Sequence, residues 1–351
     1  MKASRIRFPA LRGGLLALLA AALFGMSTPL VQRWGAGLGA FTTAALLYAG
    51  AALVGALSRQ HAAKEAKLVR GDLPRLMSMA AFGALLGPVA LAWGLQHASG
   101  TGASLMLTLE ALFTALLARL VYGETLDRRV WSAMFLLIAG GIVLVLDQGS
   151  HGGSQLWGLL AVLLATLAWG TDNTLSRALA ERDPSQVVLA KAVLGTAATA
   201  VLAVVFRDPL PTLGAAAALL TVGATGYGLS LRFYLLAQRA FGAARTGSVF
   251  AFAPFIGAAL AMSMGDRSGS WIMAVAGVLM ALGVVLHLAE SHGHAHAHEA
   301  MAHEHAHRHD DGHHNHAHHP MPTGAHSHRH AHEPLRHSHP HVPDAHHRHG
   351  H

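Results

Sequence analysis

Long apolar runs separated by short polar connections make up most of the first 290 residues of the chain. A helix needs about 20 apolar residues to cross a hydrocarbon core of ~30 Å. Runs of about this length predict ten transmembrane helices and an all-α membrane protein. The predicted spans are 12–32, 37–58, 76–95, 100–121, 130–147, 156–176, 186–206, 212–237, 243–264 and 270–289.

The first apolar run follows four basic residues, Lys2, Arg5, Arg7 and Arg12, and in this respect it resembles a signal peptide. A signal peptide has an apolar region of only about 7–15 residues. This run continues to about Leu30, so we interpret it as the first membrane helix.

The loops between the predicted helices differ in their content of Lys and Arg, which predicts the orientation of the chain. If the N-terminus lies inside, the outside loops carry only Arg33, Arg207 and Arg267. The inside loops then carry Arg59, Lys64, Lys67, Arg70, Arg75, Arg128, Arg129, Arg177, Arg182, Arg239 and Arg245. We therefore predict a multi-pass protein of the plasma (inner) membrane with both termini in the cytoplasm.

The two halves of the helical region resemble each other at an offset of about 142 residues. Gly14-Leu-Leu-Ala17 matches Gly158-Leu-Leu-Ala161, and Gly141-Ile-Val-Leu144 matches Gly283-Val-Val-Leu286. Five helices per half is an odd number, so the second half must enter the membrane from the opposite side. Inverted repeats of this kind place the substrate near the membrane midplane in transporters. The predicted units are a first five-helix repeat (1–149), a second, inverted repeat (150–290) and a tail (291–351).

The composition excludes several other classes of protein. Only 12% of residues are charged, about half the soluble-protein norm of ~25%. The chain has no cysteine, so it has neither disulfides nor thiolate metal sites. Its net charge of +7 reports the cytoplasmic loops rather than binding to nucleic acid. No Walker motif is present, so ATP hydrolysis is not supported, and we predict no enzymatic activity.

Several motifs carry a resemblance to a known family. They are Phe24-Gly25, Leu109-Glu110-Ala-Leu-Phe113, Gly123-Glu124-Thr-Leu126, Trp169-Gly-Thr-Asp-Asn-Thr-Leu-Ser-Arg177 and Ala253-Pro-Phe-Ile-Gly257. The chain resembles the ten-helix EamA-type branch of the drug/metabolite transporter superfamily, in a subgroup with a histidine-rich end. The resemblance implies secondary transport of a small molecule, within a range of amino acids, metabolites and drugs. Glu110 replaces a proline that is common in helix four of the family.

Ionisable side chains at membrane depth cost about 2.5–3.5 kcal/mol on insertion scales, so they are functional candidates by default. Glu110 lies near the middle of the fourth predicted helix without a charged neighbour in sequence. It is a candidate for proton coupling; the alternative is a structural ion pair or a hydrogen bond between helices.

Polar residues in the sixth and seventh predicted helices form a second group of candidates. Asp172 and Asn173 follow Trp169, and all three are expected to line a cavity, unless the two polar residues lie at the cytoplasmic interface. Lys191 has two interpretations. Its long side chain reaches the inner surface, or it forms a pair inside the bundle with Glu110 or Asp172.

Two arginines complete the substrate or coupling candidates. Arg232 lies about two turns from the inner end of the eighth helix, and with Tyr227 and Tyr234 it suits an anionic or aromatic substrate. A structural role is the alternative. Arg245 opens the ninth helix, where it is either interfacial or functional.

The tail from residue 291 carries 24 of the 28 histidines. It has almost no large apolar residues, so we predict that it is disordered. Imidazole suits zinc, nickel and copper, and we expect the tail to bind Zn, Ni or Co. Transport itself requires no cofactor. The candidate metal ligands are His337, His339, His341, His346, His347 and His349.

These observations favour a secondary active exporter of a small metabolite or drug-like compound, which works by alternating access coupled to protons. One alternative is a divalent-metal permease, or a transporter that metal bound to the tail regulates. Another is a membrane scaffold without transport activity, whose tail stores metal. The expected partners are the lipid bilayer, a small-molecule substrate and divalent metal ions, with no nucleic acid.

Overall fold

The protein is described by a computed structural model, and nearly all of its membrane region is helical. The structure describes residues 9–58, 66–123, 126, 128–149, 152–176, 179, 182–241, 243–288, 292–297, 301–307, 326–332 and 336–341.

The first half of the chain forms five spans, of which the third and fourth are each built from more than one helix. The elements are α1 (Pro9–Gly35), α2 (Ala40–Leu57), η1 (Arg70–Asp72), α3 (Leu73–Ala80), the π-helix η2 (Ala81–Leu86), α4 (Gly87–Leu95), α5 (Gly100–Met106), α6 (Leu109–Tyr122) and α7 (Arg128–Gly149).

The second half follows the same order of elements. It contains α8 (Gly153–Ser176), α9 (Pro184–Val205), α10 (Leu213–Val222), the π-helix η4 (Gly223–Leu229), α11 (Ser230–Phe241), α12 (Ala243–Phe250), α13 (Ala253–Ser263) and α14 (Trp271–Leu288).

The prediction of an all-α bundle of ten spans is confirmed. Eight spans are long and apolar enough to cross a membrane, and the described region adds two shorter apolar helices, Ala253–Ser263 and Trp271–His287. The ninth predicted span is divided between α12 and α13, and only its second part, α13, is one of the two shorter apolar helices.

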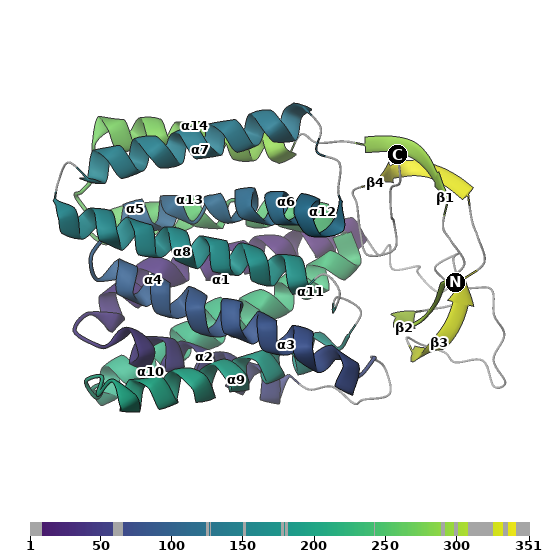
Figure 1. Cartoon of the computed structure of the whole chain (residues 1–351), viewed down its shortest axis with the longest axis horizontal. Coiled ribbons are helices and arrows are strands. Elements are labelled where there is room, and N and C mark those ends of the chain that lie inside the picture. The colour runs from purple at the N-terminus through teal and green to yellow at the C-terminus, as the bar shows by residue number, and fades with distance from the viewer. Residues whose placement is uncertain are drawn as a thin grey trace, which may run out of the picture.

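Helices from the two halves pack as pairs. The most extensive contacts join α7 to α14 and α2 to α9. Figure 1 shows the first pair along one flank of the bundle and the second along the other, with α1 and α8 between them. Leu53, Phe135, Leu146 and Val204 keep more than half of their surface exposed. Such apolar side chains suit contact with lipid, because every backbone group of a helix is already hydrogen-bonded.

The two π-helices occupy matching places in the two halves. η2 begins at Ala81 and η4 at Gly223, 142 residues later. A π-turn interrupts the normal hydrogen-bond ladder of an α-helix and often occurs at functional sites. This match adds a structural counterpart to the sequence repeat, while the boundaries 1–149 and 150–290 stay predictions.

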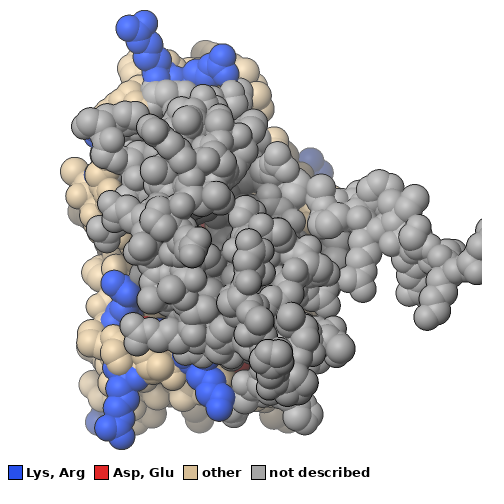
Figure 2. Space-filling view, turned by 90° about the vertical axis from the view of Figure 1, so that its right-hand side faces the viewer, with Lys and Arg blue, Asp and Glu red and all other residues tan. Residues whose placement is uncertain are grey.

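The described start of the chain and the end of α14 lie at the same end of the bundle (Figure 1). We call this the tail end, and the other the distal end. Figure 2 looks onto the tail end and shows Lys and Arg side chains around its rim. The even number of spans explains why both ends of the helical region meet here. Assignment of this side to the cytoplasm stays a prediction.

The tail contains structure that the sequence did not lead us to predict. Its described part forms four short strands: β1 (His292–Ala297), β2 (Met301–His307), β3 (His326–His332) and β4 (Arg336–His341). β1 pairs with β4 and β2 with β3, both antiparallel. An alternating sequence has the period of a strand, and a strand pair needs no buried core to satisfy its inner backbone groups. His346, His347 and His349 lie outside the described residues.

Candidate functional site

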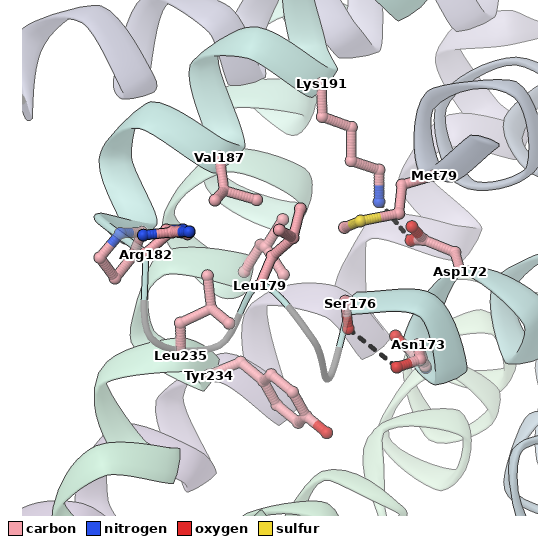
Figure 3. A pocket seen from close by; sticks show the side chains of 12 residues that line it. Met79, Asp172, Asn173, Ser176, Leu179, Arg182, Val187, Lys191, Tyr234 and Leu235 are labelled. Atoms are coloured by element: carbon pink, nitrogen blue, oxygen red, sulfur yellow. Dashed lines mark hydrogen bonds and ion pairs between the residues drawn. The ribbon is translucent and has the colours of Figure 1, made fainter. Parts of the chain in front are cut away.

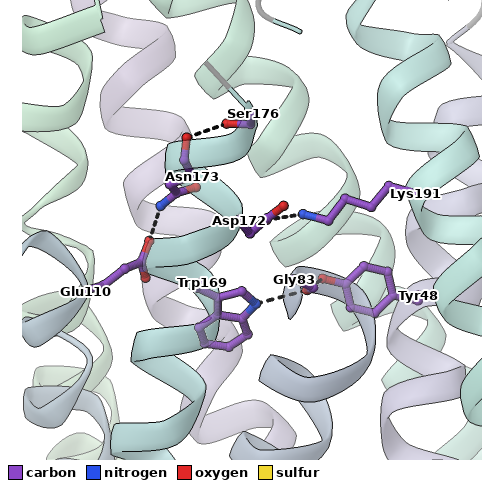
Figure 4. Close-up of polar contacts among 8 residues, drawn as sticks. All are labelled: Tyr48, Gly83, Glu110, Trp169, Asp172, Asn173, Ser176 and Lys191. Atoms are coloured by element: carbon purple, nitrogen blue, oxygen red, sulfur yellow. Dashed lines mark hydrogen bonds and ion pairs between the residues drawn. The ribbon is translucent and has the colours of Figure 1, made fainter. Parts of the chain in front are cut away.

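Two consecutive residues of α8 reach towards different neighbours in the middle of the bundle (Figure 4). Successive residues on an α-helix point about 100° apart. Asp172 therefore meets Lys191 of α9, while Asn173 meets Glu110 of α6. The structure thus brings together four of the residues predicted from the sequence.

Lys191 and Asp172 form an ion pair inside the protein. Each residue keeps only 5% of its surface exposed, so Lys191 does not extend to the membrane surface. The Asp172 Oδ2 atom accepts from the Lys191 ammonium. Its second oxygen, Oδ1, is buried and accepts no hydrogen bond from any residue that the structure describes.

Glu110 and Asn173 form the second contact. The Asn173 side-chain amide donates to Glu110 Oε1 over 2.6 Å. The fourth span is broken at residues 107–108, so Glu110 lies in the first turn of α6. A carboxylate is stabilised there because the N-terminus of a helix carries partial positive charge. Among the described residues, no ion pair involves Glu110.

The π-helix η2 supplies a backbone acceptor beside these groups. The carbonyl of Gly83 accepts from the Tyr48 hydroxyl and from Trp169 Nε1, the latter over 3.0 Å. A Cβ atom at Gly83 would overlap the Asp172 carboxylate, so glycine is required for this approach. Sequence reasoning missed both Tyr48 and the Gly83 carbonyl.

Aromatic rings cover the site on one side. The centroid of Phe24 lies 5.7 Å from that of Trp169 and 6.0 Å from that of Tyr227. Tyr48 and Tyr227 are 5.7 Å apart, edge to face. Such contacts favour edge-to-face geometry and form a rigid apolar wall.

A narrow pocket extends between the α8–α9 connection at the tail end and the polar centre, by which we mean Glu110, Asp172, Asn173 and Lys191. Figure 3 shows the side chains that line this pocket. Its volume of about 20 Å³ accommodates a water molecule rather than a metabolite. The lining residues are Met79, Asp172, Asn173, Ser176, Leu179, Arg182, Pro184, Val187, Lys191, Leu231, Tyr234 and Leu235.

Of the two remaining arginine candidates, Arg232 is not among the residues that line this pocket. Arg232 lies on α11, where its neighbours Leu231 and Tyr234 line the pocket instead. The side chain of Arg245, on α12, lies outside the described part of the structure. Their roles stay predictions. Arg182 lines the pocket near its mouth and forms an ion pair with Asp72 over 2.9 Å.

The distal end is closed by side chains that bond to backbone groups of other spans. We call this set the distal clamp. Two glutamines donate to backbone carbonyls: Gln32 Nε2 to those of Leu95 and Ala98 (3.0 and 2.9 Å), and Gln96 Nε2 to that of Leu38 (2.9 Å). Two aspartates accept: Asp208 Oδ2 from the Thr42 amide (2.9 Å), and Asp266 Oδ2 from the Thr101 amide and hydroxyl (2.8 and 2.9 Å).

Asp266 is the most heavily bonded carboxylate of the clamp. Besides Thr101, it accepts from the amide and hydroxyl of Ser268. Burial opposes ionisation, but the hydrogen bonds from Ser268 and Thr101 outweigh it and lower the pKa of Asp266. Asp266 therefore stays ionised at physiological pH.

No group of three or more His, Cys, Asp or Glu side chains suited to a metal ion occurs in the part of the structure whose side chains are described. The tail histidines are not in that part.

Comparison with known proteins agrees with this arrangement. A relative from Methanothermobacter thermautotrophicus, described as an uncharacterized transporter, is 27% identical over 231 residues. The match covers 63% of this chain and 66% of the relative, just under two thirds of its length. A protein known from a crystal structure superposes with a TM-score of 0.58 at 19% identity, covering 78% of this chain and 94% of the other. The latter likeness supports the fold alone.

The sequence profile of the EamA-like transporter family matches the chain twice, at residues 11–146 and 156–289. These two matches span most of the helical bundle, including both halves of the polar centre. The chain belongs to the EamA-like transporter family.

Proposed function

We propose that the protein is a secondary active transporter that exports a small metabolite or drug-like compound by alternating access coupled to protons. The observation that carries this proposal is the polar centre of the bundle. There the Lys191–Asp172 ion pair and the Glu110–Asn173 hydrogen bond lie side by side inside the helical bundle. Such groups are expensive at membrane depth and mark substrate or ion pathways.

The access to this centre supports alternating access. The pocket approaches it from the tail end, whereas the distal clamp closes the opposite end. If the basic loops at the tail end are cytoplasmic, the protein takes its substrate from the cytoplasm in this state. That order of events corresponds to export.

The chemistry of the centre favours a substrate with both polar and apolar parts. Asp172 Oδ1 offers a buried acceptor for an N–H or O–H group of the substrate. Phe24, Trp169 and Tyr227 provide an aromatic wall for its apolar part. Because the pocket now holds only about one water, the lining helices must separate before a metabolite enters.

Glu110 is the group to which we assign proton coupling. Among the described residues its carboxylate forms no ion pair. Protonation is therefore the simplest means of neutralising Glu110 during the transport cycle. Protonation would also weaken its bond to Asn173, since the amide then donates to a neutral oxygen. The proton would thereby affect the α8 turn that also carries Asp172.

Transport into everted membrane vesicles tests this proposal. Vesicles with an imposed proton gradient are supplied with a panel of metabolites, and the substrate found is then measured with Glu110→Gln. We expect substrate binding to persist while gradient-driven accumulation falls by about tenfold or more, a loss of at least ~1.4 kcal/mol of coupling. Asp147→Asn is the matched control, because Asp147 is a buried carboxylate that bonds Ser270 near the distal end.

Unchanged proton-driven uptake by Glu110→Gln would refute the coupling role. The same vesicles, supplied with Zn²⁺, Ni²⁺ or Co²⁺ in place of metabolites, also examine the second candidate function, a divalent-metal permease. Saturable metal uptake without any organic substrate would favour that function over the one proposed.

A further inference from the structure

The strands of the tail place histidines directly opposite one another. In the β1–β4 pair, three histidines of one strand are register partners of three in the other, and the β2–β3 pair repeats this arrangement. The partners are His292 with His341, His294 with His339, His296 with His337, His303 with His330, His305 with His328 and His307 with His326.

The register assigns these histidines to one face of each pair. Residues two apart in a strand share a face, and directly opposed residues share it across the strands. Six histidines therefore share a face in β1–β4. The other face of that pair carries only non-histidine residues, for example Gly293 opposite Pro340 and Ala295 opposite Ser338.

The β2–β3 pair has the same segregation and adds His332 to its histidine face, opposite Met301. Its other face pairs Glu304 with Arg329, an opposite-charge pair that stabilises a cross-strand register. Both strand pairs also follow one common register. Met301 follows His292 by nine residues, and its partner His332 precedes His341, the partner of His292, by the same number.

The spacing on such a face suits a transition-metal ion. Directly opposed Cβ atoms lie about 4.5–5.5 Å apart, and diagonal neighbours about 7–8 Å apart. An imidazole nitrogen binds zinc at about 2.0–2.1 Å, usually with four ligands in a tetrahedron. One opposed pair and a diagonal neighbour thus come within reach of a single ion without a change of register.

We propose that each strand pair of the tail is a divalent transition-metal site, with ligands that are histidines opposed across the two strands. The sites would take Zn²⁺, Ni²⁺ or Co²⁺, which imidazole binds well. The three ligand candidates His337, His339 and His341 belong to β4, and the pairing adds partners for them in β1. The residues of these two sites are not those of the polar centre, so the proposal does not depend on the proposed transport function.

Exchanging neighbouring residues within a strand moves its histidines to the other face without changing the composition. Such variants distinguish binding by opposed histidines from binding that depends only on the number of histidines. The full-length protein is first prepared with every tail histidine other than the six opposed ones of β2 and β3, His332 included, replaced by asparagine. In the exchange variant, His326 changes places with Ser327, His328 with Arg329 and His330 with Ala331. These three histidines then share a face with each other but no longer with those of β2.

A second exchange should restore the site. His303 changes places with Ala302, His305 with Glu304 and His307 with Ala306, in addition to the first exchange. The register then opposes histidine to histidine on the other face, and the Glu–Arg pair is also restored. All three proteins contain the same residues, and the spacing of two within each three-histidine run is unchanged.

Zinc affinity is measured for the three metal-free proteins by competition with a coloured chelator. We expect the single exchange to weaken the tightest site about tenfold or more and the double exchange to recover it. Equal affinities in all three would overturn the proposal and assign binding to composition alone. Loss in both exchange variants would also overturn it, because opposed register would then not be sufficient. Equal melting temperatures of the helical bundle confirm that the comparison concerns the tail.

Discussion

At the residue scale, a contribution to the stability of the fold does not by itself explain why Lys191 and Asp172 form a buried ion pair. Bringing two charges into a low-dielectric interior costs several kcal/mol per ion, and their attraction often does no more than offset this. A neutral pair of similar shape would hold α8 against α9 at least as well. We therefore propose a functional role for the charged pair, namely that Asp172 Oδ1 and Lys191 bind a polar group of the substrate.

This argument predicts a difference between single and double variants. Lys191→Ala leaves Asp172 buried without its counter-charge, so we expect a destabilisation of about 3–5 kcal/mol. Asp172→Asn combined with Lys191→Gln keeps a hydrogen-bonded neutral pair, and we expect it to unfold within about 1 kcal/mol of the wild type. Thermal unfolding in detergent gives both values.

Transport by the double variant then distinguishes the two roles of the pair. We expect it to be folded but inactive. A double variant that is both stable and fully active would show that the pair only holds the helices together.

Sequence reasoning found most of the individual residues of the centre and named Asp172 as one of two possible partners of Lys191, but it did not predict the bond between Glu110 and Asn173. Glu110, Asp172, Asn173 and Lys191 stand out because ionisable or amide groups interrupt apolar runs. Their pairing depends on the rotation of α8, α6 and α9, to which single-sequence periodicity is blind when a helix is apolar all round. The Gly83 carbonyl was beyond prediction for a second reason, since a π-turn has no sequence signature here.

At the element scale, breaks within spans provide the polar groups with backbone partners. The third and eighth spans each contain a π-helix, and the fourth and ninth are divided at residues 107–108 and 251–252. The sequence predicted each of these spans as one continuous helix, because a hydropathy run does not change when the hydrogen-bond ladder is interrupted. Span number and order were predictable, whereas the irregularities that build the site were not.

The distal clamp joins elements that the proposed alternating access would have to separate. Because the pKa of Asp266 is lowered, its hydrogen bonds stabilise the closed end fully above the ordinary aspartate pKa of about 3.9. This contribution is lost only as the pH falls through the lower folded-state value. We therefore expect the closure of the distal end to be independent of pH between about 5 and 8.

Asp266→Asn should loosen this clamp, because an amide replaces a charged acceptor of four hydrogen bonds. The chain has no cysteine, so Ser104→Cys introduces a unique buried thiol in α5. If the substitution makes opening of the distal end about 1.4 kcal/mol more favourable, the labelling rate of this thiol from the distal side should rise about tenfold.

Ser263→Ala is the control for the clamp experiment, since its exposed hydroxyl bonds only within its own helix. Equal labelling rates in the Asp266→Asn and Ser263→Ala backgrounds would remove Asp266 from the gate. A labelling rate in the wild-type background that changes steeply between pH 5 and 8 would contradict the pH prediction.

At the scale of the whole molecule, the proposal of export rests on the position of the pocket together with the predicted orientation of the chain. The pocket is lined by residues of the α8–α9 connection at the tail end, and the family assignment makes the chain a transporter. Direction therefore depends on which side of the membrane the tail end occupies. The predicted answer rests on the basic residues in the connections at this end, such as Lys67, Arg70 and Arg128, against Arg33, Arg207 and Arg267 in the predicted loops at the other.

Cysteine labelling in intact cells checks this orientation. Leu210 is 93% exposed in the distal connection between α9 and α10, and Gly71 has open space around its Cα in the tail-end connection before α3. A membrane-impermeant maleimide should label Leu210→Cys in intact cells, and Gly71→Cys only after permeabilisation. The opposite pattern would place the pocket mouth outside the cell. The polar centre would be unchanged, but the structure would then show a state that receives its substrate from outside, and the same proton-coupled site would serve uptake instead of export.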